Sequence, residues 1–165
     1  MTMKILSLAI AATLIAAPFA RAGASDSDFV MKAGQAGLAE VALGNDAGTM
    51  GKSDAVKHFG QRMVTDHSSA NAKLQTAAAS GGFRLPAEPS AEQKAFEMEL
   101  KAMQGAAFDK AYAAQAVKDH KGAVALFEEE AKSGKDADLK AFANATLPTL
   151  REHLKMAEDL AATTK

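Results

Sequence analysis

"AFDKAYAAQAVKDHKGAVALFE" (residues 107–128) places side chains of one face at steps of three and four residues. That face carries Asp109, Tyr112, Ala116, His120, Ala123 and Phe127. Steps of three and four are typical of an α-helix that buries one side. The segment therefore predicts a long helix over about residues 106–132, with ionisable groups on its buried side.

Three more long segments follow the same pattern, so four long helices are expected. One covers about residues 27–47, one starts near Ser53, and one covers about residues 136–162. Their buried sides are expected to carry Phe29, Ala33, Ala36, Glu40, Leu43 and Ala47; Phe59, Met63, His67, Ala70 and Leu74; and Leu139, Phe142, Thr146, Leu150, His153, Ala157 and Leu160. Ser90 and Gln93 form a capping box that starts a shorter helix. The sequence thus predicts an all-α fold, an antiparallel four-helix bundle with an additional short helix.

Glycine and proline mark the breaks between these helices. Clusters lie at residues 46–52, 80–90 and 132–136. Pro148 falls inside the last helix, where it lacks a backbone donor and crowds the preceding turn, so a kink is expected. Histidines preceded by an acid recur at uneven intervals along the chain, so we expect no repeat of fixed period.

The first residues have the composition of a secretory signal peptide. Lys4 precedes an apolar run from Ile5 to Ala17, and small residues follow. The run is too short to span a bilayer comfortably, so we expect a cleaved leader at residues 1–22 and no stable membrane anchor. Cleavage after Ala22 or Ala24 would leave one helical domain at about residues 25–162, exported to a compartment such as a bacterial periplasm.

Charge and cysteine content exclude several classes of protein. The net charge is −1, and it becomes −3 once Lys4 and Arg21 leave with the leader, so a nucleic-acid-binding surface is not expected. The chain has no cysteine, which excludes disulfides and a lipid anchor at the cleavage point. Stability must therefore come from packing.

Every long helix carries an ionisable residue on its expected buried side: Glu40, His67, His120 and His153. Burying such a group without a partner costs several kcal/mol, so these groups are expected to meet one another, water or a metal. Asp109 and Tyr112 share the buried side of His120. His58 lies nine residues before His67, on the opposite side of its helix, and is expected to be solvated.

An acid precedes each of the three buried-side histidines: Asp66, Asp119 and Glu152. From its position, such an acid points towards a neighbouring helix and can accept a hydrogen bond from an imidazole there. A carboxylate in that place fixes the tautomer of the histidine and raises its basicity as a metal ligand. The alternative is that these acids face solvent.

Helix lengths leave the heights of the histidines open. His120 is expected roughly 18 Å before the last long turn and His153 roughly 26 Å after it, a mismatch of about one and a half turns. A shared layer of rings is therefore allowed but not required.

Four segments, in order and over the whole mature chain, resemble the bacterial family of the domain of unknown function 4142: "FVMKAGQAGLAEVALG", "VKHFGQRMVTDHSSANAKL", "AFDKAYAAQAVKDHKGAVALFE" and "LKAFANATLPTLREHLKMAEDL". The resemblance implies an exported, ferritin-like four-helix core without an established activity. A ferritin-like di-iron site requires Glu-x-x-His on two helices. Val64, Val117 and Leu150 stand three residues before the histidines, so a dinuclear carboxylate site is not expected.

Two functions remain open. In the first, His67, His120 and His153 bind one Zn, Cu or Fe ion, and Glu40 or Asp109 completes the shell. The surrounding support would come from Asp66, Tyr112, Asp119 and Glu152. In a copper variant, Met63 and Met156, each one turn from a histidine, add thioether ligands, although core filling is the ordinary use of methionine.

In the second function, the same polar residues form a satisfied hydrogen-bond network that rigidifies the bundle. The protein would then act through its surface, on a component of the cell envelope or in a stress response. A homodimer is compatible with either function. No glycine-rich phosphate loop or serine nucleophile motif is present, and without a metal nothing points to an enzyme.

Overall fold

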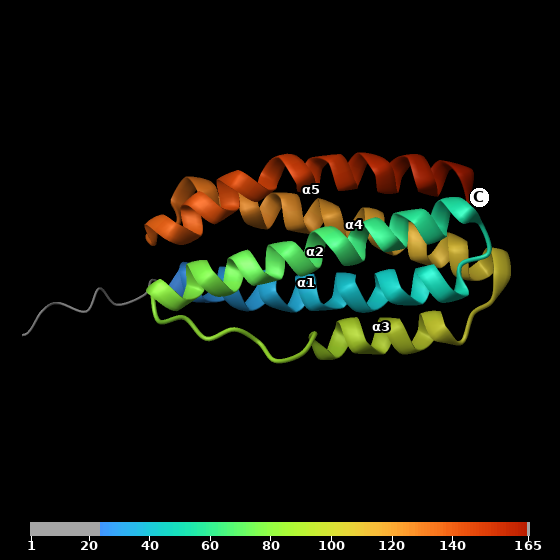
Figure 1. Cartoon of the computed structure of the whole chain (residues 1–165), viewed down its shortest axis with the longest axis horizontal. Coiled ribbons are helices and arrows are strands. Elements are labelled where there is room, and N and C mark those ends of the chain that lie inside the picture. Colours follow the sequence, from blue (N-terminus) through green and yellow to red (C-terminus); the bar gives the residue numbers. More distant parts are fainter. Residues whose placement is uncertain (1–23, 165) are drawn as a thin grey trace, which may run out of the picture.

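The structure is a computed structural model that describes residues 24–164, and the predicted signal peptide lies outside them. Within that range the chain forms five α-helices and no strand: α1 (Ala24–Met50), α2 (Asp54–Ser80), α3 (Ala91–Lys101), α4 (Gly105–Ser133) and α5 (Ala137–Thr163). The predicted all-α fold is confirmed (Figure 1). None of these helices combines the length and the apolar character needed to cross a membrane.

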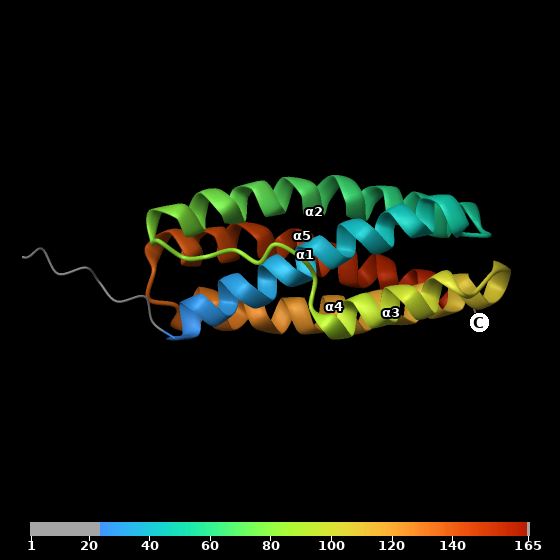
Figure 2. The ribbon, with the colours of Figure 1, turned by 90° about the horizontal axis from the view of Figure 1, so that it is seen from below.

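The four long helices form a ring in which each has two neighbours. Helix α1 packs against α2 and α4, and α5 packs against the same two helices. All four neighbouring pairs run antiparallel, as Figures 1 and 2 show together. A long crossover containing α3 joins α2 to α4 and lies outside the ring, against α1 and α4. One long crossover in an antiparallel bundle is the connectivity of ferritin-like folds, as predicted.

The helix starts follow from capping side chains. Ser53 accepts a hydrogen bond from the Val56 N–H at 3.3 Å, and the predicted capping box of Ser90 and Gln93 is present. Asp136 caps α5 through the N–H groups of residues 138 and 139. Helix α5 continues through Pro148, and its ribbon bends in its first half (Figure 1), the distortion expected where a proline removes a backbone donor.

The core consists of two apolar clusters separated along the bundle axis. One contains Met63, Phe59 and Leu160 with their neighbours. The other contains Phe29, Leu74, Phe127 and Phe142 with theirs. On each long helix, one of the residues Glu40, His67, His120 and His153 falls between the positions that enter the first cluster and those that enter the second. These four groups therefore form a polar layer between the two apolar clusters.

Two aspartates reveal a repeat that we did not expect from the sequence. Asp109 in α4 accepts the N–H groups of Lys52 and Ser53 in the α1–α2 turn, at 2.8 and 2.9 Å. Asp26 in α1 accepts the N–H groups of Lys135 and Asp136 in the α4–α5 turn, at 2.9 and 3.0 Å. Both aspartates and both turns are separated by 83 residues.

The same separation of 83 residues relates further positions: Phe29 and Tyr112, Val56 and Leu139, and Phe59 and Phe142. The expectation of no fixed period was wrong, because it considered only the acid–histidine pairs, which this repeat does not relate. Helices α1 and α2 thus form one hairpin, α4 and α5 form a second, and each hairpin binds the turn of the other.

Candidate metal centre

Three histidines reach the same height because of helix ends and side-chain direction. His67 and His120 precede the ends of α2 and α4 by equal lengths of chain, and His153 follows the start of α5 by a slightly greater length. Measured from the end of the bundle where α2 and α4 end and α5 starts, His67 and His120 lie at a height of about 20 Å and His153 at about 24 Å. Side chains lean towards the N-terminus of their helix, and α5 runs opposite to α2 and α4, so the rings lean towards one another. The mismatch expected from sequence was therefore too large.

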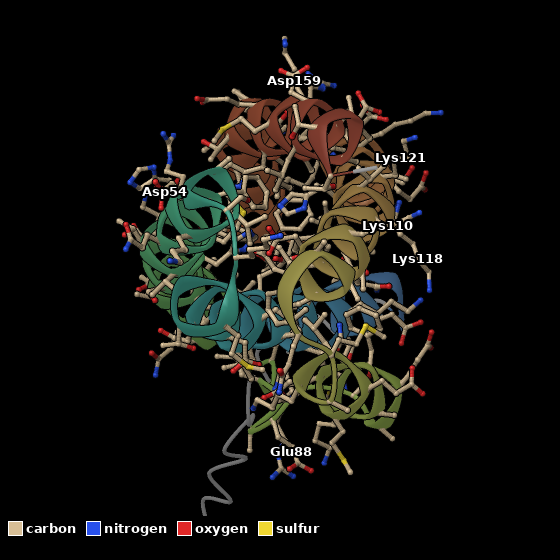
Figure 3. The ribbon with its side chains drawn as sticks, turned by 90° about the vertical axis from the view of Figure 1, so that its right-hand side faces the viewer. Asp54, Glu88, Lys110, Lys118, Lys121 and Asp159 are labelled. Carbon is tan, nitrogen blue, oxygen red and sulfur yellow. The ribbon has the colours of Figure 1, made fainter. Side chains whose placement is uncertain are left out.

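The three rings converge in the bundle interior. Their centroids are 5.6 Å apart for His67–His120 and 5.4 Å for the two other pairs. One ring nitrogen from each lies within 4.8 Å of the others. The residues are 8, 1 and 1% exposed in sequence order. Figure 3 shows nitrogen atoms inside the ring of helices, whereas the labelled Lys118, Lys121 and Asp159 point outward.

Hydrogen bonds fix the tautomers of two of these rings. His120 Nδ1 lies 2.9 Å from the Ala116 carbonyl, which can only accept, so Nδ1 donates. His153 Nε2 lies 2.9 Å from Asp66 Oδ2 and donates to that carboxylate. The remaining nitrogens, His120 Nε2 and His153 Nδ1, therefore carry bare lone pairs. Both are buried without a hydrogen-bond partner, and so is His67 Nε2.

Asp66 is the support that the sequence predicted for a histidine of another helix. Burial alone would raise the pKa of Asp66, but hydrogen bonds and charge from Arg62 and His153 outweigh it and lower this pKa. Arg62 forms an ion pair with the same carboxylate oxygen and lies 3.5 Å from Glu152 Oε1. Asp66 is therefore an anion that accepts from His153 and is itself held by Arg62. Arg62 was missed, although its position one turn before Asp66 was the available signal.

Burial keeps the rings neutral at pH 7. It lowers the pKa of His67 to about 3, and the charges of the two other histidines add to this effect. Burial also lowers the pKa of His120 to about 4, and it lowers that of His153 although Asp66 opposes the shift. A neutral imidazole with a free lone pair is the form that binds a metal.

Glu40 lies on the Nδ1 side of the His120 ring, whereas the unpartnered nitrogen of that ring is Nε2. Its Oε1 is 3.7 Å from His120 Nδ1, and the two nitrogens of an imidazole point in divergent directions. Burial, reinforced by the charge of Asp119, raises the pKa of Glu40 to about 8. Tyr112 lies nearby, packed on Phe59 and Phe108, with a buried hydroxyl that has no partner. Burial and then Glu40 raise the pKa of Tyr112 well above its usual value.

The three other acids expected at the site, Asp109, Asp119 and Glu152, bind groups other than the imidazoles. Asp109 uses both carboxylate oxygens on the α1–α2 turn, so the expected ligand is a turn-binding residue instead. Asp119 is half-buried and accepts from Gln115 Nε2 at 2.9 and 3.0 Å. Glu152 is exposed and pairs with Arg62. Of the three acids that precede histidines, Asp66 alone among the described residues bonds an imidazole.

The two methionines of the copper variant pack in the apolar cluster on one side of the histidine layer. Met63 is fully buried there, and Met156 is partly buried against it. This position matches the core-filling use of methionine. Each sulfur nevertheless belongs to the turn next to a histidine of the cluster.

Comparisons with known proteins agree with this architecture. The model of the family described as "Domain of unknown function (DUF4142)" matches residues 12–160. The fold is similar to a crystal structure of a DUF305 fragment from Deinococcus radiodurans, with a TM-score of 0.74 and 13% identity over 86% of this chain and 98% of that one. No functionally curated protein matches this chain. Because the family model spans most of its length, the chain belongs to the family of the domain of unknown function 4142.

Proposed function

We propose that this protein is an exported bundle that binds one divalent transition-metal ion through His67, His120 and His153. The observation that supports the proposal is the cluster of three buried imidazoles, which bring one ring nitrogen each within 4.8 Å of the others and which each have a buried nitrogen without a hydrogen-bond partner. Two of these nitrogens carry lone pairs because their rings donate elsewhere. Export rests on the composition of residues 1–22.

Lone pairs confined together in an apolar interior require a cation or a donor. A proton is a poor candidate at pH 7, because the pKa values of His67 and His120 are about 3 and about 4. A divalent metal supplies the missing positive charge, and imidazole suits Zn, Cu, Fe and Ni. Bonds of about 2.0–2.1 Å would separate the nitrogens by about 3.3–3.6 Å. The present separations of at most 4.8 Å need only a modest closure of the rings.

The alternative function, a satisfied hydrogen-bond network, agrees less well with the geometry. Ala116 and Asp66 bond one nitrogen of His120 and one of His153, respectively. The other nitrogen of each ring has no partner. Such a network would need an ordered water among the three rings. The protein would then carry its function on its surface.

Metal titration separates the two functions. We expect that one equivalent of Zn, Cu or Fe raises the melting temperature of the mature protein, and that His120→Gln abolishes the gain. Binding to the native state alone adds about 2.7 kcal/mol at a metal concentration a hundredfold above the dissociation constant.

The fourth histidine is the matched control for this titration. His58 is exposed on the same helix as His67, so His58→Gln should retain the full gain. A gain that survives His120→Gln, or that disappears in His58→Gln, would contradict the proposal. If none of the three metals raises the melting temperature, the hydrogen-bond network is the function that remains.

A further inference from the structure

A small cavity adjoins two of the three histidines. It has a volume of about 40 Å³, and its lining includes His67, His153, Asp66 and Thr149. A cavity of this size accommodates a water molecule or an ion of two or three atoms, since one water needs about 10–15 Å³ by this measure. The space beside the candidate metal position is therefore suited to a very small ligand.

A larger groove lies on the outside of the same wall, between α2 and α5. Its volume is about 790 Å³. The groove and the cavity share five lining residues: Asp66, Ala70, Phe142, Thr146 and Thr149. Two of them are threonines and one is an alanine, so short side chains form much of the partition. This side of the bundle therefore offers a short connection between solvent and the cavity beside the rings.

The three histidines offer three ligands of the usual type at one point. Among the described residues, the group whose ligand atoms lie together contains three histidines and no carboxylate. Glu40 lies at the far edge of His120 and Asp109 is bound to a turn. Closed structural sites have four protein ligands, whereas sites with three keep a position for water or another exogenous ligand.

We infer that the metal centre keeps one coordination position open towards the cavity of His67 and His153, and that water or a small monoanion reaches it through the α2–α5 groove. This inference rests on the proposed function. It makes the centre one that exchanges a ligand with solvent, rather than a closed structural staple. The occupant must be small because the cavity is.

Cobalt(II) and azide test the open position directly. Cobalt replaces the divalent metal as a coloured probe, and its visible spectrum reports a change of ligand. We expect azide to change the spectrum of the cobalt-loaded wild-type protein in a saturable manner. Thr149→Leu and Ala70→Leu fill the shared wall, so azide binding should become slower by an order of magnitude at an unchanged affinity for cobalt.

Ala145→Leu is the matched control for Thr149→Leu. Ala145 lies one turn before Thr149 on α5 and lines the outer groove but not the cavity. The control should therefore bind azide at the wild-type rate, and melting temperatures verify that each variant folds. Cobalt binding without any response to azide, or equal rates in Thr149→Leu and Ala145→Leu, would overturn the inference while leaving metal binding intact. Failure of cobalt to bind at all would overturn the proposed function as well.

Discussion

Asp66 determines how His153 presents itself to the other rings. Its Oδ2 accepts from both His153 Nε2 and Arg62, so the lone pair of His153 is directed to Nδ1. A carboxylate in this position also makes the imidazole a stronger donor to a metal. In the proposed site, the residue that supports the ligand therefore lies on α2, whereas the ligand itself, His153, lies on α5.

Asp66→Asn should weaken metal binding without removing a ligand. An amide has no full negative charge and presents either an oxygen or an NH₂ group to His153, so it holds the tautomer less firmly. We expect a loss of affinity of about 10- to 100-fold, the usual effect of removing such a support. Competition with a chelator measures it. Glu152→Gln, which alters the exposed acid on the other side of Arg62, should change affinity little, and an equal loss in both variants would refute the role of Asp66.

Sequence alone identified the three histidines and offered Asp66 as a support for one of them, but it did not give the height of each polar residue along the bundle. The spacing along each helix placed His67, His120 and His153 on buried sides, and all three are buried. Asp109 was expected in the same place because it shares a helix face with His120. A face, however, does not specify height, and Asp109 lies three turns away at the end of the bundle, where backbone N–H groups bind it.

At the scale of helices, the reciprocal aspartates connect the two hairpins. Each carboxylate accepts two backbone N–H groups from a turn that is distant in sequence and belongs to the other hairpin. Asp109→Ala leaves two donors of the α1–α2 turn without these acceptors and should lower the free energy of unfolding by about 2–4 kcal/mol, since hydrogen bonds to a charged group contribute about 1.5–3 kcal/mol each and solvent replaces part of the loss.

Denaturant unfolding measures that loss, and metal titration distinguishes its cause. If Asp109 binds only the turn, the folded Asp109→Ala protein keeps the whole metal-induced gain in stability. The equivalent variant of the other hairpin, Asp26→Ala, should be destabilised in the same direction. Loss of the metal response in Asp109→Ala would instead restore Asp109 as a ligand.

The end of α4 carries a titratable group with a predictable effect. Burial, together with the charges of Asp26 and Asp136, raises the pKa of Glu130 to about 7 from its ordinary value of 4.5. The folded state therefore holds this proton more tightly than the unfolded state does. Stability from this source is present below about pH 4.5 and is lost as the pH rises through about 7.

Glu130→Gln should remove this contribution of Glu130 to the pH dependence of the free energy of unfolding. We expect the variant to gain stability over the wild-type protein between pH 5 and pH 8, because the neutral amide loses no proton. Urea denaturation at several pH values measures the difference. Glu40 contributes a slope of the same sign in both proteins, so the curve flattens only in part. Glu129, the exposed neighbour of Glu130, is the control. A similar change in Glu129→Gln would contradict the assignment of this pH dependence to Glu130.

Sequence predicted the helices better than the way in which they meet. Ser53 and Ser90 were visible as helix starts because capping depends on neighbouring residues, and the start of the last helix near Asp136 was visible from the glycine-bearing break before it. The repeat of 83 residues escaped notice because side chains differ at most equivalent positions, and because the pattern becomes clear only when each aspartate is seen to bind the opposite turn. Heights depend on helix ends, which sequence places only within a few residues.

At the scale of the whole molecule, the bundle gives up apolar packing in its middle layer. Apolar clusters occupy both sides of that layer, while three histidines with unpartnered nitrogens fill it. Burying polar groups in this way costs free energy, and replacing them with apolar residues of similar volume is often neutral or stabilising. A layer that served stability alone would be expected to be apolar, so the histidines favour a function that requires them.

The triple variant His67→Leu, His120→Leu, His153→Leu tests this view. Without metal at pH 7, we expect it to unfold at an equal or higher urea concentration than the wild-type protein, because leucine joins the two apolar clusters. The difference should grow on acidification. The pKa values of His67 and His120 are lowered from 6.5 to about 3 and about 4, so the wild-type protein loses stability as the pH falls below about 6.5, where the unfolded chain takes up protons that the folded one does not.

Metal should reverse the order of the two proteins. Added at pH 7 in excess, it stabilises the wild-type bundle and leaves the triple variant unchanged, because the variant retains none of the three imidazoles. The wild-type protein then becomes the more stable of the two if the metal gain exceeds the intrinsic benefit of leucine. The urea concentrations at the unfolding midpoint, with and without metal, measure both the stabilisation by metal and the intrinsic effect of the leucines. A metal-free triple variant that is several kcal/mol less stable at pH 7 would show instead that the histidines hold the fold together, and the metal function would lose its structural argument.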